Sequence, residues 1–208
     1  MKIHSQAYLY MLILFIIGCI SWFFFGGVFS ILWFVLFLYV AYFFRQPLYK
    51  VDIKENEILS PAWGKVTSVT DVTAEDGTKS IVVSIFLSIF DVHLQCAPCA
   101  GIVESVKYEK GAFLNAMKAE SSTCNERNLM VIKTAFNGKM IKVTQIAGLI
   151  ARRILCFKST GDSLYSGEYY GLIRFGSRVD ICFPSDVDIY VKPGERVNGG
   201  LTLLGCFR

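Results

Sequence analysis

The chain has 208 residues, of which 53% are hydrophobic and 18% are charged, and its formal net charge is +4. The mean hydropathy of +0.47 is high for a soluble protein, and the apolar excess lies at the N-terminus. No dense run of lysine and arginine, and no alternation of basic with aromatic residues, suggests a nucleic-acid partner, so we predict none. The length suits one domain once a membrane segment is removed.

The cysteines and histidines exclude two further classes of site. Seven cysteines, odd in number and scattered, argue against a disulfide framework and for a reducing compartment. Cys96 and Cys99 form a CxxC pair, but no helix start or second ligand pair accompanies it, so we interpret both as buried small residues in a turn. His4 and His93 are the only histidines, which excludes a multi-histidine zinc centre, and we predict no metal site.

Residues 8–44 are almost unbroken apolar sequence without a charge. At about 1.5 Å per residue, a helix of this length is too long for one span of a hydrocarbon core about 30 Å thick. The glycine pair at 26–27 divides the run, so we predict a membrane anchor over 1–46 with a helical hairpin at 8–25 and 28–43. A single long tilted helix is the alternative. A cleaved signal peptide is disfavoured because the apolar region is too long and no small-residue cleavage site precedes the body.

Positive residues flank both ends of the apolar region, with Lys2 before it and Arg45 and Lys50 after it. Under the positive-inside rule, this distribution places both ends on the cytoplasmic side of a membrane. The basic net charge is compatible with anionic lipid nearby, and equally with an ordinary solvated surface.

From residue 47 onward the pattern changes to short alternating segments separated by turn residues. Many short strands at this spacing predict a mostly β domain over 47–208, arranged as a β-sandwich or barrel-sandwich. The segment 148–156 fits a short helix or a strand, and we favour a helix through 149–153. The expected strands cover residues 64–70, 80–90, 100–106, 129–135, 139–145, 179–183, 188–191 and 199–204.

Gly176 and Ser177 form a dipeptide that can react with its own backbone, inside the strand-like run 174–180. The serine hydroxyl can attack the Gly176 carbonyl and replace the amide with an ester. Elimination then cleaves the chain and leaves a dehydroalanine, which tautomerises and hydrolyses to a pyruvoyl group with release of ammonia. Glycine suits the site because it lacks Cβ and tolerates strained backbone. A Gly-Ser pair alone is usually an ordinary turn, so its significance depends on other motifs.

Several short motifs accompany this dipeptide along the chain. They are Phe43–Pro47, Phe90–His93, Asn125–Asn128, Ile146–Ile154, Gly161-Asp162, Gly167–Ile173 and Arg174–Asp180. In this order and spacing the set resembles the phosphatidylserine decarboxylase proenzymes, in particular the short bacterial form. The resemblance covers the chain from about Phe43 to the C-terminus, and it is specific because unrelated motifs occur in the family's order.

The resemblance implies an enzyme that matures by cleavage between Gly176 and Ser177. The large chain, 1–176, and the small chain, 177–208, would stay together as a heterodimer, because strands on both sides of the cut share one core. Ser177 would become a pyruvoyl cofactor, the electron sink when phosphatidylserine loses CO2 to give phosphatidylethanolamine. Because this substrate lies in a bilayer, the resemblance implies the bacterial inner membrane, with the catalytic domain facing the cytoplasm. A homo-oligomer is compatible with it.

His93 stands at the position of the family's catalytic histidine. With an ordinary pKa of about 6.5, its imidazole can take the serine proton and return protons near neutral pH. Asp91 is interpreted as structural or lipid-facing. Arg152 and Arg153 match a family motif and can hold the phosphate or carboxylate of the substrate. Surface salt bridges are the alternative for both arginines.

Trp63 departs from the family pattern. The resemblance implies an aspartate here, in a Pro-Ala-Asp-Gly motif, which holds the histidine in the required tautomer as in a Ser-His-Asp triad. This chain reads Ser-Pro-Ala-Trp-Gly over residues 60–64. An indole can donate a hydrogen bond, but it cannot accept one from an imidazole or carry negative charge. Asp71, Asp76 and Asp180 are candidates for a substitute.

Two other functions fit parts of the sequence. An uncleaved, lipid-binding homologue without catalytic activity would explain Trp63. A membrane-anchored β-barrel-sandwich adaptor or carrier would explain the glycine-punctuated segment Val191–Gly200, although no lysine stands at a carrier hairpin. An uncleaved chain would support the first function. The second predicts no electrophilic carbonyl and no dependence on Ser177.

Overall fold

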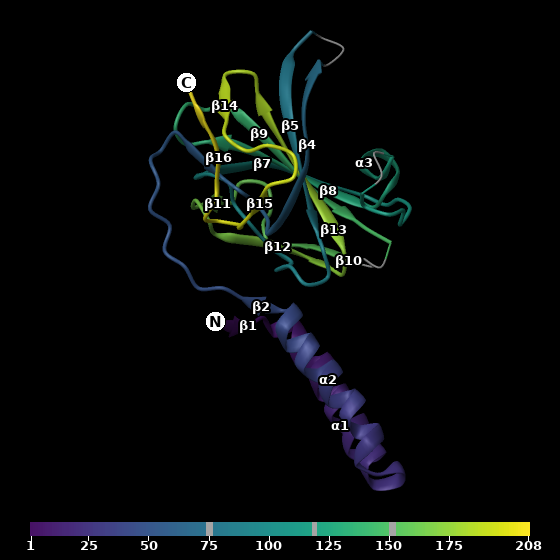
Figure 1. Ribbon diagram of the computed structural model, residues 1–208. Helices are drawn as coiled ribbons and strands as arrows, with labels where there is room; N and C mark the ends of the chain where they lie inside the picture. The colour runs from purple at the N-terminus through teal and green to yellow at the C-terminus, as the bar shows by residue number, and fades with distance from the viewer. Residues whose placement is uncertain (74–76, 118–119, 150–152) are drawn as a thin grey trace. The chain divides into compact units, whose positions relative to one another are not determined.

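The computed structural model describes residues 1–73, 77–117, 120–149 and 153–208. They form two compact units, Met1–Tyr49 and Lys50–Arg208, each of which is described by itself. The first is mainly helical, and the second is built almost entirely of antiparallel strands (Figure 1). The predicted fold class, a mostly β domain with apolar helices at the N-terminus, is confirmed.

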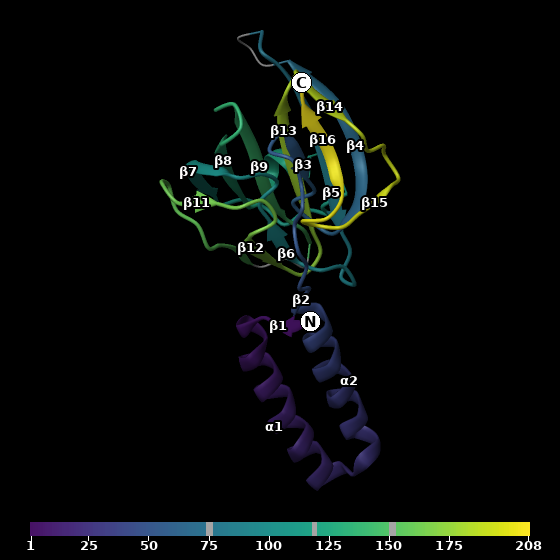
Figure 2. The ribbon, with the colours of Figure 1, turned by 90° about the vertical axis from the view of Figure 1, so that its left-hand side faces the viewer.

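Two antiparallel helices make up most of the first unit, α1 (Tyr8–Phe25) and α2 (Gly27–Phe43) (Figure 1, Figure 2). Gly26 separates them with a φ of 77°, a left-handed conformation that ends α1 and lets the chain reverse. Most of the large apolar side chains on both helices are exposed. Ser5–Phe25, with a mean hydropathy of 2.2, is long and apolar enough to cross a membrane by length and composition. Both helices lie within one residue of their predicted bounds.

The open end of the helix pair carries a short strand pairing. β1 (Lys2–Ile3) pairs antiparallel with β2 (Arg45–Gln46), and the one-turn helix η1 (Ser5–Ala7) follows β1. The Arg45 guanidinium donates a hydrogen bond of 2.8 Å to the Tyr42 carbonyl and lies 3.7 Å from the centre of the Tyr42 ring. A positive charge is therefore anchored where α2 ends.

Antiparallel strands of two kinds of sheet build the second unit. The large sheet contains β4 (Gly64–Thr73), β5 (Lys79–Leu87), β7 (Gly101–Glu109), β8 (Arg127–Thr134), β9 (Met140–Ala147), β11 (Ser163–Leu164), β13 (Ser177–Pro184) and β15 (Arg196–Val197). The small sheets contain β3 (Glu57–Leu59), β6 (Leu94–Cys96), β10 (Arg153–Cys156), β12 (Tyr169–Arg174), β14 (Val187–Ile189) and β16 (Leu203–Phe207). A short helix, α3 (Ser121–Cys124), precedes β8.

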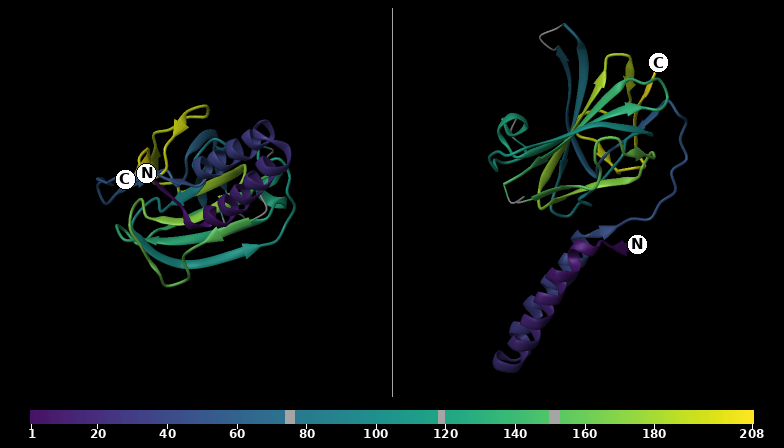
Figure 3. Two further views of the ribbon diagram at one scale, coloured as in Figure 1. Left: turned by 90° about the horizontal axis from the view of Figure 1, so that it is seen from below. Right: turned by 180° about the vertical axis from the view of Figure 1, so that it is seen from behind.

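The large sheet has eight strands in the order β11-β7-β8-β9-β13-β5-β4-β15. This sheet is strongly curved, and the two three-stranded sheets β10-β12-β6 and β14-β16-β3 belong to the same unit (Figure 2, Figure 3). β13 lies near the middle of the large sheet, paired with β9 on one side and β5 on the other. The dipeptide that the sequence singled out thus enters the central part of the sheet.

The burial pattern of β13 places its first residue in the core. Ser177, Val179, Ile181 and Phe183 are each 0% exposed, while the residues between them are partly exposed. Because successive side chains of a strand point to opposite faces, Ser177 shares its face with the three apolar residues. Its hydroxyl therefore lies in a mostly apolar, water-excluded environment.

Two expected elements are wrong. The favoured helix through 149–153 does not form in its described part, because Arg153–Cys156 is strand β10 and pairs with β12. Pairing with a neighbouring strand satisfies the backbone there and outweighs a weak local preference for helix. The last strand begins at Leu203, four residues later than expected. Residues 199–202 instead form a turn in which Gly200 has a φ of 70°.

Candidate active site

Ser177 carries a buried hydroxyl at the junction of β12 and β13. Its side chain is 0% exposed, and its Oγ has no hydrogen-bond partner among the described residues. A buried polar group left unpaired costs about 1–3 kcal/mol, so most are satisfied in folded proteins. An unsatisfied serine hydroxyl at the start of a central strand fits a nucleophile that is kept available for reaction.

The backbone in front of Ser177 is strained. Phe175 has a φ of 64°, and it is the one residue other than glycine with a positive φ in the described part of the chain. Gly176 follows with a φ of 44°, in the same left-handed region. An L-residue in this region costs of order 1 kcal/mol or more and persists only where the surroundings enforce it. The strain therefore lies directly before the Gly176–Ser177 peptide bond.

Gly148 packs against the carbonyl group that Ser177 would attack. A Cβ atom on Gly148 would lie 2.2 Å from the Gly176 oxygen and 3.0 Å from the Gly176 carbonyl carbon. Asn125 holds the segment before it, because its Nδ2 donates hydrogen bonds to the carbonyls of Ala147 (2.7 Å) and Leu114 (2.8 Å). Because Gly148 has no side chain, the backbone at Gly148 can lie directly against the backbone at Gly176.

We expect Gly148→Ala to stop cleavage at Gly176–Ser177, because the added methyl group must displace the Gly176 carbonyl. A matched control is Gly101→Ala, whose Cβ would lie 2.3 Å from the Lys133 oxygen in the pairing of β7 with β8. Both variants should lower the melting temperature, but only the first should block cleavage, measured by intact mass under denaturing conditions. Equal cleavage rates in the two folded variants would contradict the role given to Gly148.

His93 lies in the loop between β5 and β6 and is 0% exposed. Its Nδ1 is 2.9 Å from the carbonyl oxygen of Asp91. Because a carbonyl can only accept, Nδ1 carries the proton and Nε2 carries the lone pair that a general base needs. The His93 carbonyl accepts a hydrogen bond of 3.2 Å from the Ile173 N–H. Ile173 belongs to β12, the strand that leads into Gly176 and Ser177, so the fold ties His93 to this segment.

A chain of buried amides runs behind His93 and was not anticipated from the sequence. Gln95 donates to the His93 carbonyl (2.7 Å), Gln145 donates to Gln95 (2.9 Å), and Asn128 donates to Gln145 (3.1 Å). All three amide residues are at most 2% exposed. Such fully connected networks hold the groups they contact in one arrangement. The available signal was a single amide residue at an inward position of a strand whose neighbouring inward positions are apolar, as with Gln145 after Ile141 and Val143 on β9.

Trp63 fills a space rather than supplying an acceptor. It is 7% exposed, and its ring is stacked with Tyr169 at a centroid distance of 6.1 Å. A Cβ on Gly199 would lie 2.6 Å from the indole ring, so a glycine is needed beside it. That Trp63 replaces the family's acid, with the consequences for catalysis, remains a prediction. The packing of the indole shows that the side chain is part of the core.

The candidates for a substitute acid lie elsewhere. Asp71 is exposed on β4. Asp180 lies on the face of β13 opposite Ser177 and pairs with Arg178, with 2.6 Å between Nε and Oδ1. Asp76 is outside the described residues. Neither described candidate therefore makes the contact with Nδ1 of His93, which the Asp91 carbonyl makes instead.

The arginines of the sequence motifs have different surroundings. Arg152 lies outside the described residues. Arg153 is exposed at the start of β10, directly opposite Arg174 in the pairing with β12. Arg127 donates through Nε to Glu109 (2.7 Å), so this arginine belongs to an ion pair at the surface. Of Arg127 and Arg153, Arg153 is the more exposed.

The CxxC pair lies in the core. Cys96 and Cys99 are 0% and 3% exposed, and burial raises the pKa of the Cys99 thiol to about 12. A thiol with so high a pKa is protonated at neutral pH and is a poor nucleophile or metal ligand. The predicted burial of both cysteines agrees with this environment, but the predicted turn is wrong for Cys96, which ends strand β6.

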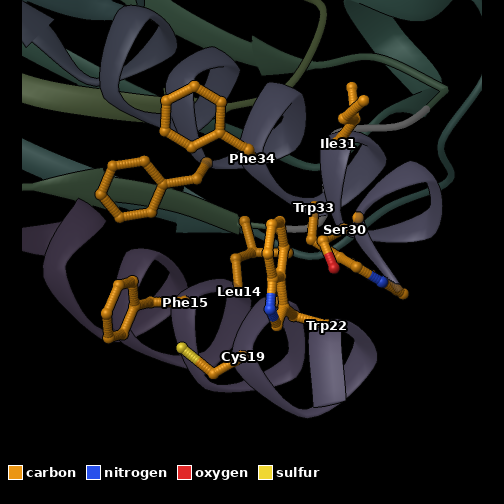
Figure 4. A pocket seen from close by; sticks show the side chains of 11 residues that line it. Leu14, Phe15, Cys19, Trp22, Ser30, Ile31, Trp33 and Phe34 are labelled. Carbon is orange, nitrogen blue, oxygen red and sulfur yellow. The ribbon is translucent and has the colours of Figure 1, made fainter. Parts of the chain in front are cut away.

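The first unit contains a hollow between α1 and α2 with a volume of about 590 Å³ (Figure 4). Its lining includes Leu14, Phe15, Trp22, Trp33, Phe34 and Phe37. No histidine, carboxylate or arginine belongs to this lining, so the hollow offers neither a general base nor a phosphate ligand. Its apolar lining suits a hydrocarbon chain, and the candidate catalytic residues, Ser177 and His93, lie in the β unit.

A sequence profile of the family described as "Phosphatidylserine decarboxylase" matches residues 36–205. The chain belongs to the phosphatidylserine decarboxylase family. The match begins within α2 and extends almost to the C-terminus, so it includes Gly176 and Ser177 as well as His93. The predicted family and enzyme class are confirmed.

Curated relatives agree with this assignment over most of the chain. A phosphatidylserine decarboxylase proenzyme of Ehrlichia chaffeensis is 38% identical over 205 residues, which are 98% of this chain and 90% of the relative. The proenzyme of Syntrophotalea carbinolica is 47% identical over 181 residues, covering 86% of this chain and 84% of the relative. That of Carboxydothermus hydrogenoformans is 44% identical over 179 residues, covering 85% and 83%. The assignment therefore does not depend on the β unit's motifs alone.

Proposed function

We propose that the chain is a phosphatidylserine decarboxylase proenzyme that cleaves itself between Gly176 and Ser177. The observation that carries the proposal is the buried Oγ of Ser177, which has no hydrogen-bond partner in the part of the chain that the structure describes and follows the left-handed residues Phe175 and Gly176. The relatives are named proenzymes, which supports a precursor that is processed. Glycine at 176 and at 148 places no side chain of these two residues beside the carbonyl, which favours an attack on it.

The proposed cleavage uses residues already in the core. His93 Nε2 takes the proton from Ser177 Oγ, and the oxygen attacks the Gly176 carbonyl carbon. The C–N bond breaks, the proton passes to the freed amine, and an ester joins the two parts. Loss of the Ser177 α-proton then expels Gly176 as a carboxylate and leaves a dehydroalanine at position 177. Tautomerisation and addition of water release ammonia and leave the pyruvoyl group.

The pyruvoyl group would supply an electrophilic carbonyl that withdraws electrons from the carbon that loses CO2 in phosphatidylserine. The protein would contribute a water-excluded site around position 177 and His93 as a proton donor to the product, phosphatidylethanolamine. Arg153, and Arg152 beside it in sequence, would hold the anionic groups of the substrate. An arginine suits a phosphate because its fork of N–H groups matches the oxygens.

The two products would remain together after the cut. Residues 177–208 contribute β13, whose residues pair with β5 on one side and β9 on the other, and both partners belong to residues 1–176. This heterodimer would be held in the bacterial inner membrane by α1 and α2, with the β unit on the cytoplasmic side, where a lipid substrate can reach it. A homo-oligomer is compatible with the arrangement.

The test is the intact mass of the purified full chain, dissociated by denaturant. We expect two species, corresponding to residues 1–176 and 177–208, with the smaller one blocked at its N-terminus by a pyruvoyl group. Phosphatidylethanolamine should then form when phosphatidylserine is supplied in detergent micelles. A single species near 23.4 kDa that persists for days would overturn the proposal.

A non-catalytic, uncleaved lipid-binding homologue is the second candidate, favoured by the indole at position 63. It predicts the single species. It also predicts that Trp63→Asp, tested in the same assay, would restore cleavage if this position alone had silenced the site. The adaptor hypothesis is not carried forward, because the chain belongs to a family of enzymes.

A further inference from the structure

A histidine that acts as a general base needs a hydrogen-bond acceptor at its other ring nitrogen, which fixes the tautomer. Trp63 cannot be that acceptor, because an indole only donates. We propose that Asp91 is the positioning residue for His93, with its carbonyl accepting the Nδ1 hydrogen bond and its carboxylate holding that carbonyl in place. This inference rests on the proposed function, since it explains how self-cleavage proceeds without a carboxylate at position 63.

The turn before His93 is closed through both the main chain and a side chain. The Asp91 N–H donates to the Ser88 carbonyl at 2.9 Å. In return, the Ser88 N–H and the Ser88 hydroxyl each donate to Asp91 Oδ2 at 2.8 Å. Three hydrogen bonds therefore join the two residues and fix the side chain and the N–H of Asp91. The carbonyl that faces His93 Nδ1 at 2.9 Å projects from the Cα atom that these bonds anchor.

The other oxygen of the Asp91 carboxylate, Oδ1, pairs with the guanidinium of Arg196. The Asp91 side chain is 8% exposed and that of Arg196 is 67% exposed. With one partner largely in solvent, the pair contributes little to stability. The pair instead links two parts of the chain. Arg196 belongs to β15, which follows the proposed cut, whereas the loop that carries His93 precedes it. Each oxygen of the Asp91 carboxylate thus has a partner.

The main chain on the other side of the imidazole is also held. The His93 carbonyl accepts hydrogen bonds from Gln95 Nε2 (2.7 Å) and from the Ile173 N–H (3.2 Å). With Asp91 fixed before the ring and these donors after it, the imidazole has little freedom to turn. A neutral carbonyl selects the tautomer as a carboxylate does, but it does not offset the charge of an imidazolium. Self-cleavage here should therefore depend on position more than on charge.

The tautomer can be measured directly in the full chain. The sequence has two histidines. In a His4→Gln background, 15N-labelled histidine therefore reports His93 alone. The Ser177→Ala variant keeps the precursor intact during the NMR measurement, so the result does not depend on whether the chain cleaves. We expect an N–H resonance for Nδ1 and a lone-pair resonance for Nε2. Asp91→Ala should give signals of both tautomers in the same precursor.

The rate of cleavage is measured separately, in chains that retain Ser177. Asp91→Ala should slow cleavage about 10-fold to 100-fold, the scale seen when the partner that orients a metal-binding histidine is removed. Arg196→Gln, which removes an exposed partner and leaves the turn intact, should slow it less. The control is Asp188→Ala on β14, which breaks a more exposed pair with Arg208 (2.7 Å) and should change neither the rate nor the NMR signals.

The outcomes distinguish failure of the positioning role of Asp91 from failure of the proposed self-cleavage. A precursor with its proton on Nε2 would overturn the positioning role. The positioning role would also be overturned if Asp91→Ala and Arg196→Gln both fold and show the same His93 tautomer and the same cleavage rate as Asp188→Ala. A chain that never cleaves, yet loses its single tautomer in Asp91→Ala, would support the positioning role and contradict the proposed function.

Discussion

Ser177→Ala is expected to leave the chain in one piece, at a mass near 23.4 kDa under denaturing conditions, while the unmodified protein separates into two species. The reason is chemical, because alanine has no oxygen to attack the Gly176 carbonyl and no group to become the pyruvoyl carbonyl. Decarboxylase activity should fall to background in the same sample. Cleavage of the variant at the same bond would contradict the proposed mechanism.

The same variant should be at least as stable as the precursor. The Ser177 hydroxyl is buried without a hydrogen-bond partner among the described residues, so removing it relieves a desolvation penalty of about 1 kcal/mol or more. The matched control is Ser84→Ala, a 1% exposed serine of β5 whose Oγ accepts a hydrogen bond of 2.8 Å from Arg178. That control should cleave normally and lose melting temperature. A function kept at the expense of stability is common at reactive sites.

His93→Asn is expected to reduce the rate of self-cleavage by about 10⁴-fold, the scale seen when a catalytic triad loses its working tautomer. The asparagine amide can keep the hydrogen bond that Nδ1 makes to the Asp91 carbonyl, but it offers no base in place of Nε2. The fold should therefore persist while proton transfer from Ser177 fails. The measurement is the fraction of cleaved chain over time, by denaturing mass analysis.

His4→Asn is the matched control, since His4 is the other histidine of the chain and lies in the separate helical unit. It should mature at the unmodified rate. Circular dichroism and the melting temperature would show whether the His93 variant is folded. A folded His93→Asn chain that cleaves as fast as His4→Asn would remove His93 from the mechanism.

Periodicity and composition were enough for the broad architecture. The apolar run with a central glycine pair predicted α1 and α2 to within one residue, and the alternating segments predicted most strands of the large sheet. These signals are local, because a helix or a half-buried strand displays its own burial pattern. Where the pattern was short and ambiguous, the preference for helix was wrong in the described part of 149–153, since Arg153 belongs to β10, which pairs with β12.

The motifs were enough to find the candidate residues, but they did not predict the contacts and surroundings of those residues. Order along the chain was enough to single out Ser177 and His93. It could not show that the Ser177 hydroxyl lacks a hydrogen-bond partner among the described residues, nor that Gly148 lies against the Gly176 carbonyl. Both facts depend on which distant segments pack around the site, and no local pattern encodes that packing. Asp91 was interpreted as structural or lipid-facing, and its carbonyl proved to contact the imidazole.

The sequence by itself therefore determined the apolar helices, the β character of the remainder, the family and the reactive dipeptide, because each is written in local spacing or motif order. Only the tertiary structure decided which groups meet. Pairing of β13 between β5 and β9 turns Ser177 into the core, and the Ser88–Asp91 turn presents a carbonyl to His93. The physical reason is that hydrogen bonds and close backbone approaches between distant segments exist only after the chain has packed.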